Sequence, residues 1–328
     1  MNDLQLVTSE AKDSPSAERS LEIRRSPQRD RLINFRESIL DLTTGTNSLT
    51  VLNEFTAPDS IVKQEGLELT ADLKRFLDMA RLDAMDDQGY FVDYERLNNS
   101  TIYNEYRHEC SPRLGSFDPG MLSTVEERLA FWINLYNALV VDGVITKGVA
   151  QSVGSNPLRL LAFFRQTAYN VGGKRMSCDD IEHGILRGNR GHPMVPGPQF
   201  TSTDSRQAWV IDPVEVRIHF ALNCASRSCP PIQVYSADHL EEQLDMAARN
   251  FVANDVQLDV ERKQLSLSAI FKWFKEDFGG PEGVLDFLVE HLPDGKRKGW
   301  LLEHGDEVSF RYKPYDWGLN STKLGLEG

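Results

Sequence analysis

The first third of this chain places its hydrophobic residues at helical spacing. Leu32, Phe35 and Ile39 recur at the interval of one helix face, and the same period predicts helices over 67–85 and 93–108. We expect these helices to pack on the part of the chain that follows rather than to form a fold of their own.

The strongest predicted helix spans 123–147 and is apolar on nearly every side. Such a helix is typical of the centre of a domain. Ser123 is expected to be its N-cap, with Glu126 three residues later as capping-box partner. Asn134 and Asn137 share one face of this helix, and buried amides need hydrogen-bond partners. We therefore expect them either to hold neighbouring backbone or to point into a cleft.

Beyond this helix the pattern changes to short strands, turns and short helices. A hairpin is predicted at 169–176 around a pair of glycines. Ser177 is expected to cap a helix that runs to Arg187, with Asp180 as capping-box partner. The Gly-, Pro- and Ser-rich segment 188–206 is expected to be a long surface loop. The remaining predicted elements are a helix over 237–251, a hairpin of 256–260 with 264–267, helices over 269–278 and 283–292, and a strand over 308–312.

One further strand is predicted at 214–223. Apolar and polar residues alternate along this segment, which is typical of a half-buried strand. Arg217, His219 and Asn223 would then share one face, because side chains alternate across a strand.

Together these segments predict an α+β fold, a mostly helical single domain with a central buried helix and a small antiparallel sheet. Residues 1–30 have too little apolar surface to offset chain entropy, so we expect a disordered tail. The predicted organisation continues with a helical N-terminal extension over 31–110 that packs on the main domain, the α+β domain over 111–320, and a tail over 321–328.

Charge narrows the classes of partner. The chain has 49 acidic and 36 basic residues and a formal net charge of −13. A field of this sign repels phosphates, so we expect no nucleic-acid and no membrane partner and leave a protein partner open. We see neither a run of roughly 20 apolar residues nor a signal-peptide pattern. The expected location is therefore the cytoplasm, where cysteines are reduced.

The first candidate site follows the predicted strand 214–223. Cys224 and Cys229 come just after His219 and Asn223. A nearby histidine and arginine would favour the thiolate that nucleophilic chemistry requires, and Asn223 would stabilise an oxyanion. The alternative is a strand with one solvated face and two structural cysteines. The sequence leaves open whether the two sulfurs pair.

The second candidate site lies on the helix after Ser177. Asp179, His183 and Arg187 follow one another at intervals of four and so share a helix face, whereas Glu182 points elsewhere. A carboxylate beside a histidine fixes its tautomer and raises its basicity. The alternative is an exposed helix with a capping acid and an ordinary ion pair.

Zinc-binding residue types are also present, namely Glu182, His183, His219, Cys224 and Cys229. Their spacing matches no standard zinc motif, and neither a G-x-G-x-x-G nor a G-x-x-x-x-G-K-[ST] pattern occurs. We therefore predict no metal and no cofactor.

Four motifs resemble one known family. They are A-F-W-I-N-L-Y-N-A-L at 130–139, D-I-E-H-G-I-L-R at 180–187, I-H-F-A-L-N-C at 218–224 with S-C-P-P at 228–231, and Y-D-W-G-L-N at 315–320. In this order they resemble the family called domain of unknown function 547, found in bacteria, plants and animals. The resemblance covers roughly 122–278 and the final motif. Some relatives carry a DEP, glutaredoxin-like or leucine-zipper module, but this chain shows neither C-x-x-C nor sustained heptads.

The resemblance implies that the polar motif positions belong to one site, although it implies no reaction. These positions are Asn134, Asn137, Glu182, His183, Arg217, His219, Asn223, Cys224 and Cys229. Because they coincide with the two candidate sites, we expect both sites to meet in one cleft.

Two functions are therefore carried forward. The first is a cysteine-dependent hydrolase or acyl transferase, papain- or transglutaminase-like by analogy only, with Cys224 as nucleophile. His219 or His183 would be its base, oriented by Glu182 or Asn137. The second is a non-catalytic protein-binding or scaffold module in which the same residues have structural roles.

Overall fold

The computed structural model describes residues 27–53 and 63–322 of the chain. Its helices are α2 (Pro27–Thr44), α3 (Lys63–Ala84), α4 (Tyr94–Asn98), α5 (Thr101–Glu105), α6 (Val125–Thr146), α7 (Pro157–Gln166), α8 (Leu240–Asp255), α9 (Ala269–Trp273), α10 (Gly280–His291) and α11 (Lys296–His304). Most of the predicted disordered tail lies outside the described residues, but α2 begins at Pro27, inside the segment assigned to that tail.

The strands form two small sheets. Strands β1 (Ala168–Val171) and β2 (Lys174–Ser177) make the predicted antiparallel hairpin, as do β3 (Gln257–Asp259) and β4 (Gln264–Leu267). Strand β5 (Ser309–Tyr312) joins the second sheet parallel to β4. With a buried apolar helix and small antiparallel pairings, the mostly helical α+β class is confirmed.

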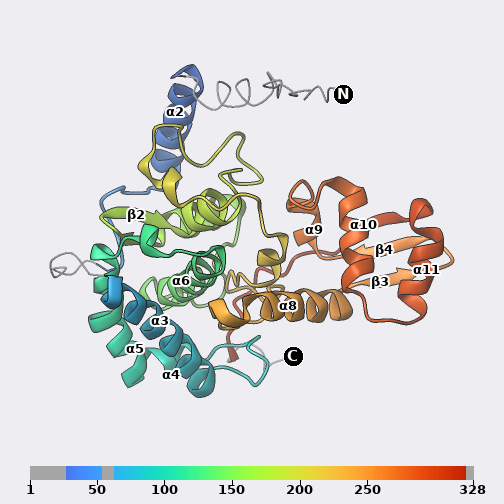
Figure 1. Cartoon of the computed structure of the whole chain (residues 1–328), viewed down its shortest axis with the longest axis horizontal. Coiled ribbons are helices and arrows are strands. Elements are labelled where there is room, and N and C mark those ends of the chain that lie inside the picture. The colour runs from blue at the N-terminus through green and yellow to red at the C-terminus, as the bar shows by residue number, and fades with distance from the viewer. Residues whose placement is uncertain (1–26, 54–62, 323–328) are drawn as a thin grey trace, which may run out of the picture.

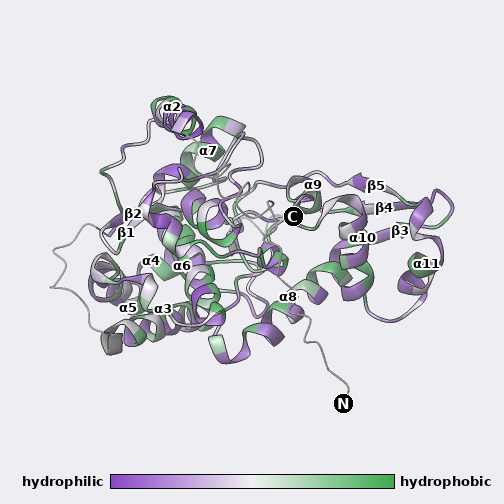
Figure 2. Ribbon diagram, turned by 45° about the horizontal axis from the view of Figure 1, so that its top comes forward, coloured by the Kyte–Doolittle hydropathy of each residue, from purple (hydrophilic) through white to green (hydrophobic). Residues whose placement is uncertain are grey.

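Helix α6 is the centre of the larger part of the molecule (Figure 1). It is long and apolar enough to cross a membrane by length and composition, contrary to our expectation, but 89% of its most apolar window is buried inside the protein. Figure 2 shows how hydrophobic residues gather along it. Its N-cap is Thr124, with Glu127 closing the capping box, so the predicted cap was one residue early.

Two hydrophobic cores divide the fold. The first surrounds α6 and includes α3, and the second lies among α8, α10 and the β3–β4–β5 sheet. Figure 1 shows the second group on one side of the molecule, with α8 reaching toward the first. A space between these groups can therefore be lined from both.

The predicted strand at 214–223 was wrong. Residues Val216–Phe220 form a 3-10 helix, η6, in which the Glu215 carboxylate accepts a hydrogen bond from the Arg217 N–H. Its apolar residues do not share one face, because Ile218 is buried in the first core and Phe220 in the second. The apolar residues of this segment alternate with polar ones because they enter two different cores on either side of η6, and not because they lie on one face of a strand.

The helix after Ser177 is also different from its prediction. Ser177 and Asp180 do exchange the expected capping hydrogen bonds. However, Asp180–Leu186 form a π-helix, η4, in which the Arg187 N–H donates to the carbonyl of Glu182. The wider turn changes which side chains share a face, so Glu182 does not point away from His183 as predicted.

Candidate functional site

A cavity of about 390 Å³ lies where the two cores approach each other. That volume is within the usual range for small-molecule sites. Its walls come from α6, α7, η4, η6, the Cys224–Pro230 loop, α9 and the segment around Tyr315. Both candidate sites contribute to it, through Glu182, His183, His219, Cys224 and Cys229.

Three predicted cleft residues hold the backbone that shapes this cavity. Asn134 pairs with both backbone groups of Tyr235. Asn137 donates to the Ala221 carbonyl and accepts from the Asn223 N–H. The Asn223 side chain in turn bonds the Pro230 carbonyl and the Ala225 N–H. These amides act as structural ties, so we assign no oxyanion role to Asn223 and no orienting role to Asn137.

Arg217 also lies away from the cavity. Its guanidinium pairs with Glu215 and with the exposed Glu241. The predicted face shared with His219 does not exist, because three residues complete a turn of a 3-10 helix. Arg217 therefore cannot stabilise a thiolate at Cys224 as the sequence suggested.

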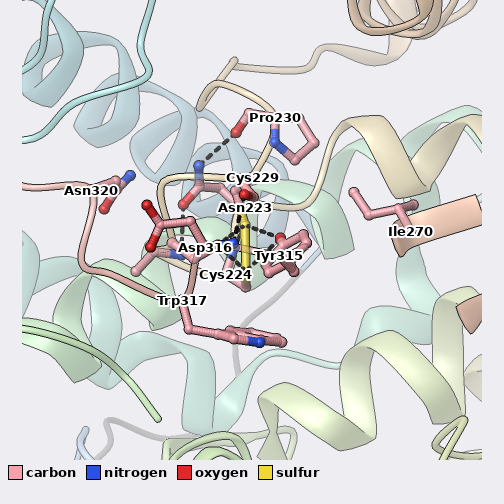
Figure 3. The surroundings of a disulfide bond; sticks show 12 residues. Asn223, Cys224, Cys229, Pro230, Ile270, Tyr315, Asp316, Trp317 and Asn320 are labelled. Atoms are coloured by element: carbon pink, nitrogen blue, oxygen red, sulfur yellow. Dashed lines mark hydrogen bonds between the residues drawn. A yellow bond between two sulfur atoms is a disulfide. The ribbon is translucent and has the colours of Figure 1, made fainter. Parts of the chain in front are cut away.

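The two cavity-lining cysteines, whose pairing the sequence left open, form a disulfide. The Tyr315 hydroxyl lies 3.4 Å from the sulfur of Cys224 and 3.2 Å from that of Cys229, as Figure 3 shows, with Trp317 beside it. Cys110 and Cys178 are free and buried. In this state Cys224 has no thiolate to offer.

His219 has a fixed tautomer. Its Nε2 lies 3.0 Å from the Oδ2 atom of Asp277. Burial alone would raise the pKa of Asp277, but hydrogen bonds from His219 and Arg187 outweigh it and hold that pKa well below its usual range. The carboxylate is therefore ionised and accepts the Nε2 proton, which leaves Nδ1 as the basic nitrogen. Burial lowers the pKa of His219, against the opposing effect of Asp277, so the ring is neutral near pH 7.

His183 has the opposite arrangement of donor and acceptor nitrogens. Its Nδ1 lies 3.1 Å from Nη1 of Arg187, which can only donate. The neutral ring must then carry its proton on Nε2. Burial lowers the pKa of His183 well below its usual value, and His192 and Arg187 lower it further. His183 is therefore a hydrogen-bond donor and a poor base.

Arg187, predicted to share a face with His183, does not line the cavity but supports both histidines. Its Nε donates to Asp277 at 2.5 Å, and Nη1 also donates to the Gly191 carbonyl. The guanidinium also stacks over the Phe274 ring, which packs on His219 at 4.1 Å.

Two carboxyl groups face the cavity beside His183. Burial raises the pKa of Asp179 well above its usual value, and Glu182 adds to that effect while Arg165 opposes it. Burial likewise raises the pKa of Glu182, which accepts a hydrogen bond from Tyr136 at 2.9 Å. Burial is thus the main reason why both groups resist ionising, and the neighbouring Glu182 adds to it at Asp179.

Asp179, His183 and His192 also have the residue types of a metal site. One ligand atom from each lies within 4.8 Å of the others. However, Nδ1 of His192 accepts from the Met194 N–H, so both rings keep their remaining proton on Nε2. A metal-bound histidine normally donates its second N–H outward, which neither ring can do here. These tautomers do not fit a metal ion.

Sequence reasoning missed several cavity residues. His192 lies in the loop predicted at 188–206. Trp273 and Phe274 belong to the helix predicted at 269–278, where no sequence motif indicated a functional role. Asp277 is 58 residues from its partner His219. The closing Tyr-Asp-Trp motif was the one available signal for Tyr315 and Trp317.

Residues 121–252 match the family model described as "Protein of unknown function, DUF547". The chain is a DUF547 domain-containing protein. The matched region of this DUF547 protein holds α6, α7, η4, η6 and both disulfide cysteines and ends within α8. Trp273, Tyr315 and Trp317 lie beyond it, so residues outside the matched region complete the cavity. No curated protein and no solved structure matches the chain.

Proposed function

We propose that this DUF547 protein is a cytoplasmic, cysteine-dependent hydrolase or acyl transferase, active when the Cys224–Cys229 disulfide is reduced. The observation that carries the proposal is the Asp277–His219 pair. It fixes a neutral imidazole with Nδ1 as the free acceptor on a residue that lines the same cavity as Cys224. A carboxylate fixes the tautomer of the general base in the same way in catalytic triads.

The reaction begins with a thiol reductant, which a reducing compartment supplies. Two electrons from two reductant thiols break the S–S bond, giving the thiols of Cys224 and Cys229 and one reductant disulfide. His219 Nδ1 then takes the Cys224 proton, and the sulfur attacks an acyl carbon. The leaving group departs with the proton from His219. Water or a second acceptor finally displaces the sulfur from the acyl group and regenerates the thiol.

His183 supports this role assignment by complementing His219. An Nε2–H held in a buried site by Arg187 is a fixed donor, suited to an oxyanion that develops on the substrate. This contrast supports His219 as the proposed base and His183 as the proposed donor.

The test is hydrolysis of p-nitrophenyl esters of short acyl chains, with and without a phosphine reductant. Wild type should become active only with reductant, Cys229→Ser should be active without it, and Cys224→Ser should be inactive in both. Because the pKa of His219 is lowered, the acid limb of kcat/KM should fall below about 6.5, the ordinary histidine value. His239→Asn, at an exposed position, is the matched control. Activity retained by reduced Cys224→Ser would disprove the nucleophile assignment.

A non-catalytic binding module is the second candidate function. The disulfide favours it, since a paired Cys224 has no nucleophile, and so do the three asparagines committed to backbone. On this alternative no reductant would reveal activity, and Cys224→Ala and His219→Ala would each lower the melting temperature by several degrees.

A further inference from the structure

The cavity wall has an uneven charge. Among the described residues, no Lys or Arg side chain lines it, whereas the carboxyl groups of Asp179 and Glu182 do. Arg187 lies behind the histidines and is already paired with Asp277. A ligand entering this space therefore meets carboxyl groups rather than cations, within a chain of net charge −13.

Asp179 is the carboxyl group of this wall that accepts no hydrogen bond from the described residues. The residue is 4% exposed, and its carboxylate makes no hydrogen bond to any described residue. Its Oδ1 atom lies 3.9 Å from Nε2 of His183, which is beyond hydrogen-bond distance. Burial raises the pKa of Asp179 and so favours its neutral form, and a cationic donor from a ligand would stabilise the ionised carboxylate.

The rest of the cavity is apolar. Leu160, Leu161, Phe164 and Met194 line one part of it. Trp273, Tyr315 and Trp317 form a contiguous aromatic group, with ring centroids 4.6–5.6 Å apart. These surfaces suit a hydrocarbon body, and aromatic faces also tolerate a neighbouring cation.

We propose that the cavity binds a primary alkylamine as its ammonium ion, with Asp179 accepting its N–H donors and the apolar wall covering its hydrocarbon chain. In the reaction under "Proposed function", on which this step rests, the amine is the acyl acceptor. The ammonium proton passes to the Asp179 carboxylate. The amine nitrogen then bonds the acyl carbon, the C–S bond to Cys224 breaks, and the second amine proton reaches the sulfur through His219. The products are an amide and the free thiol.

The structure favours this occupant over an anion or a metal ion. An organic carboxylate would face two carboxyl groups without a lining cation. A metal would need Nε2 lone pairs that His183 and His192 do not have. An ammonium ion needs only an acceptor.

The test measures binding to the oxidised full chain, so it does not depend on catalysis. Isothermal titration at pH 7.5 compares n-hexylamine, n-hexanol and sodium hexanoate. Hexylamine should bind roughly tenfold or more tightly than hexanol, because it adds a charged hydrogen bond, and hexanoate should bind most weakly.

Three variants sharpen the measurement. Asp179→Asn should abolish the advantage of hexylamine over hexanol, while Asp286→Asn, an exposed carboxyl on α10, should leave it unchanged. Leu161→Lys places a cation in the half-buried part of the wall and should reverse the preference toward hexanoate.

Four results would overturn the proposal: hexanoate binding as tightly as hexylamine, an unchanged amine preference in Asp179→Asn, no binding of any probe, or Zn²⁺ binding that needs Asp179 while hexylamine does not bind. Loss of thiol-dependent activity with amine binding intact would instead count against the proposed function alone.

Discussion

The two histidines that line the cavity lie near aspartates with opposite surroundings, Asp277 beside His219 and Asp179 beside His183. On one side, Asp277 receives hydrogen bonds from His219, Arg187 and Arg190, and its side chain is fully buried. On the other, the almost equally buried Asp179 has no hydrogen-bond partner among the described residues. The pKa of Asp277 is lowered and that of Asp179 is raised, so burial alone does not decide the charge of a carboxyl.

The difference in hydrogen-bond partners distinguishes a carboxyl group with a structural role from one that is available to bind a ligand. A carboxylate whose acceptor positions are filled by protein donors fixes a tautomer and stabilises the fold. One whose positions are empty weakens the fold and keeps its binding capacity, as functional groups often do. Substitutions on the two sides should therefore change stability in opposite directions.

The largest effect is expected for Asp277→Ala. The substitution leaves the buried Arg187 guanidinium without its carboxylate, which typically costs about 3–5 kcal/mol in the free energy of unfolding. Urea denaturation at pH 7 measures it. The lowered pKa of Asp277 means that its contribution is present above about pH 4, the unfolded value, and is lost as pH falls below it. The variant should accordingly lose less stability than wild type between pH 5 and pH 3.

Asp286→Asn is the control for that experiment, since it removes an exposed carboxyl from α10. An Asp277→Ala variant as stable as this control would show that the ion pair contributes no net stability, and the contrast between the two sides would disappear.

A smaller effect of opposite sign is expected for Asp179→Asn. A raised folded pKa means that the native state binds more protons than the unfolded state above about pH 4, so Asp179 destabilises the protein progressively as pH rises. The amide removes this penalty, and we expect a gain of roughly 0.5–2 kcal/mol at pH 8 and almost none at pH 4. Melting curves at the two pH values measure it. A pH-independent loss would mean that Asp179 has a structural partner.

The same contrast explains what the sequence could predict. Helix α6 and both hairpins follow from local periodicity and turn chemistry, and they were found. His219, Cys224, Glu182 and His183 were chosen as site candidates by motif and residue type, and they line one cavity.

What the sequence could not predict depends on distant partners. The role of His219 is set by Asp277, 58 residues further along the chain, and the tautomer of His183 is set by the Arg187 guanidinium, which Asp277 holds in turn. The strand error at 214–223 has a similar cause, because Ile218 and Phe220 enter cores built by different parts of the chain. No local pattern records such contacts.

The smallest effect is expected for Arg217→Ala. This variant tests whether ion pairs that are partly exposed to solvent contribute to the free energy of unfolding. Arg217 is as fully paired as Asp277, through Glu215 and Glu241, but the Glu241 side chain is 81% exposed. Solvent screens such pairs, so the variant should lose about 1 kcal/mol or less, with the loss shrinking further in 0.5 M salt. Thiol-dependent activity should be unchanged, because Arg217 does not line the cavity. A loss of stability approaching that of Asp277→Ala would mean that η6 depends on this ion pair to hold His219. The position of an ion pair in the chain, rather than its burial, would then decide its contribution to stability.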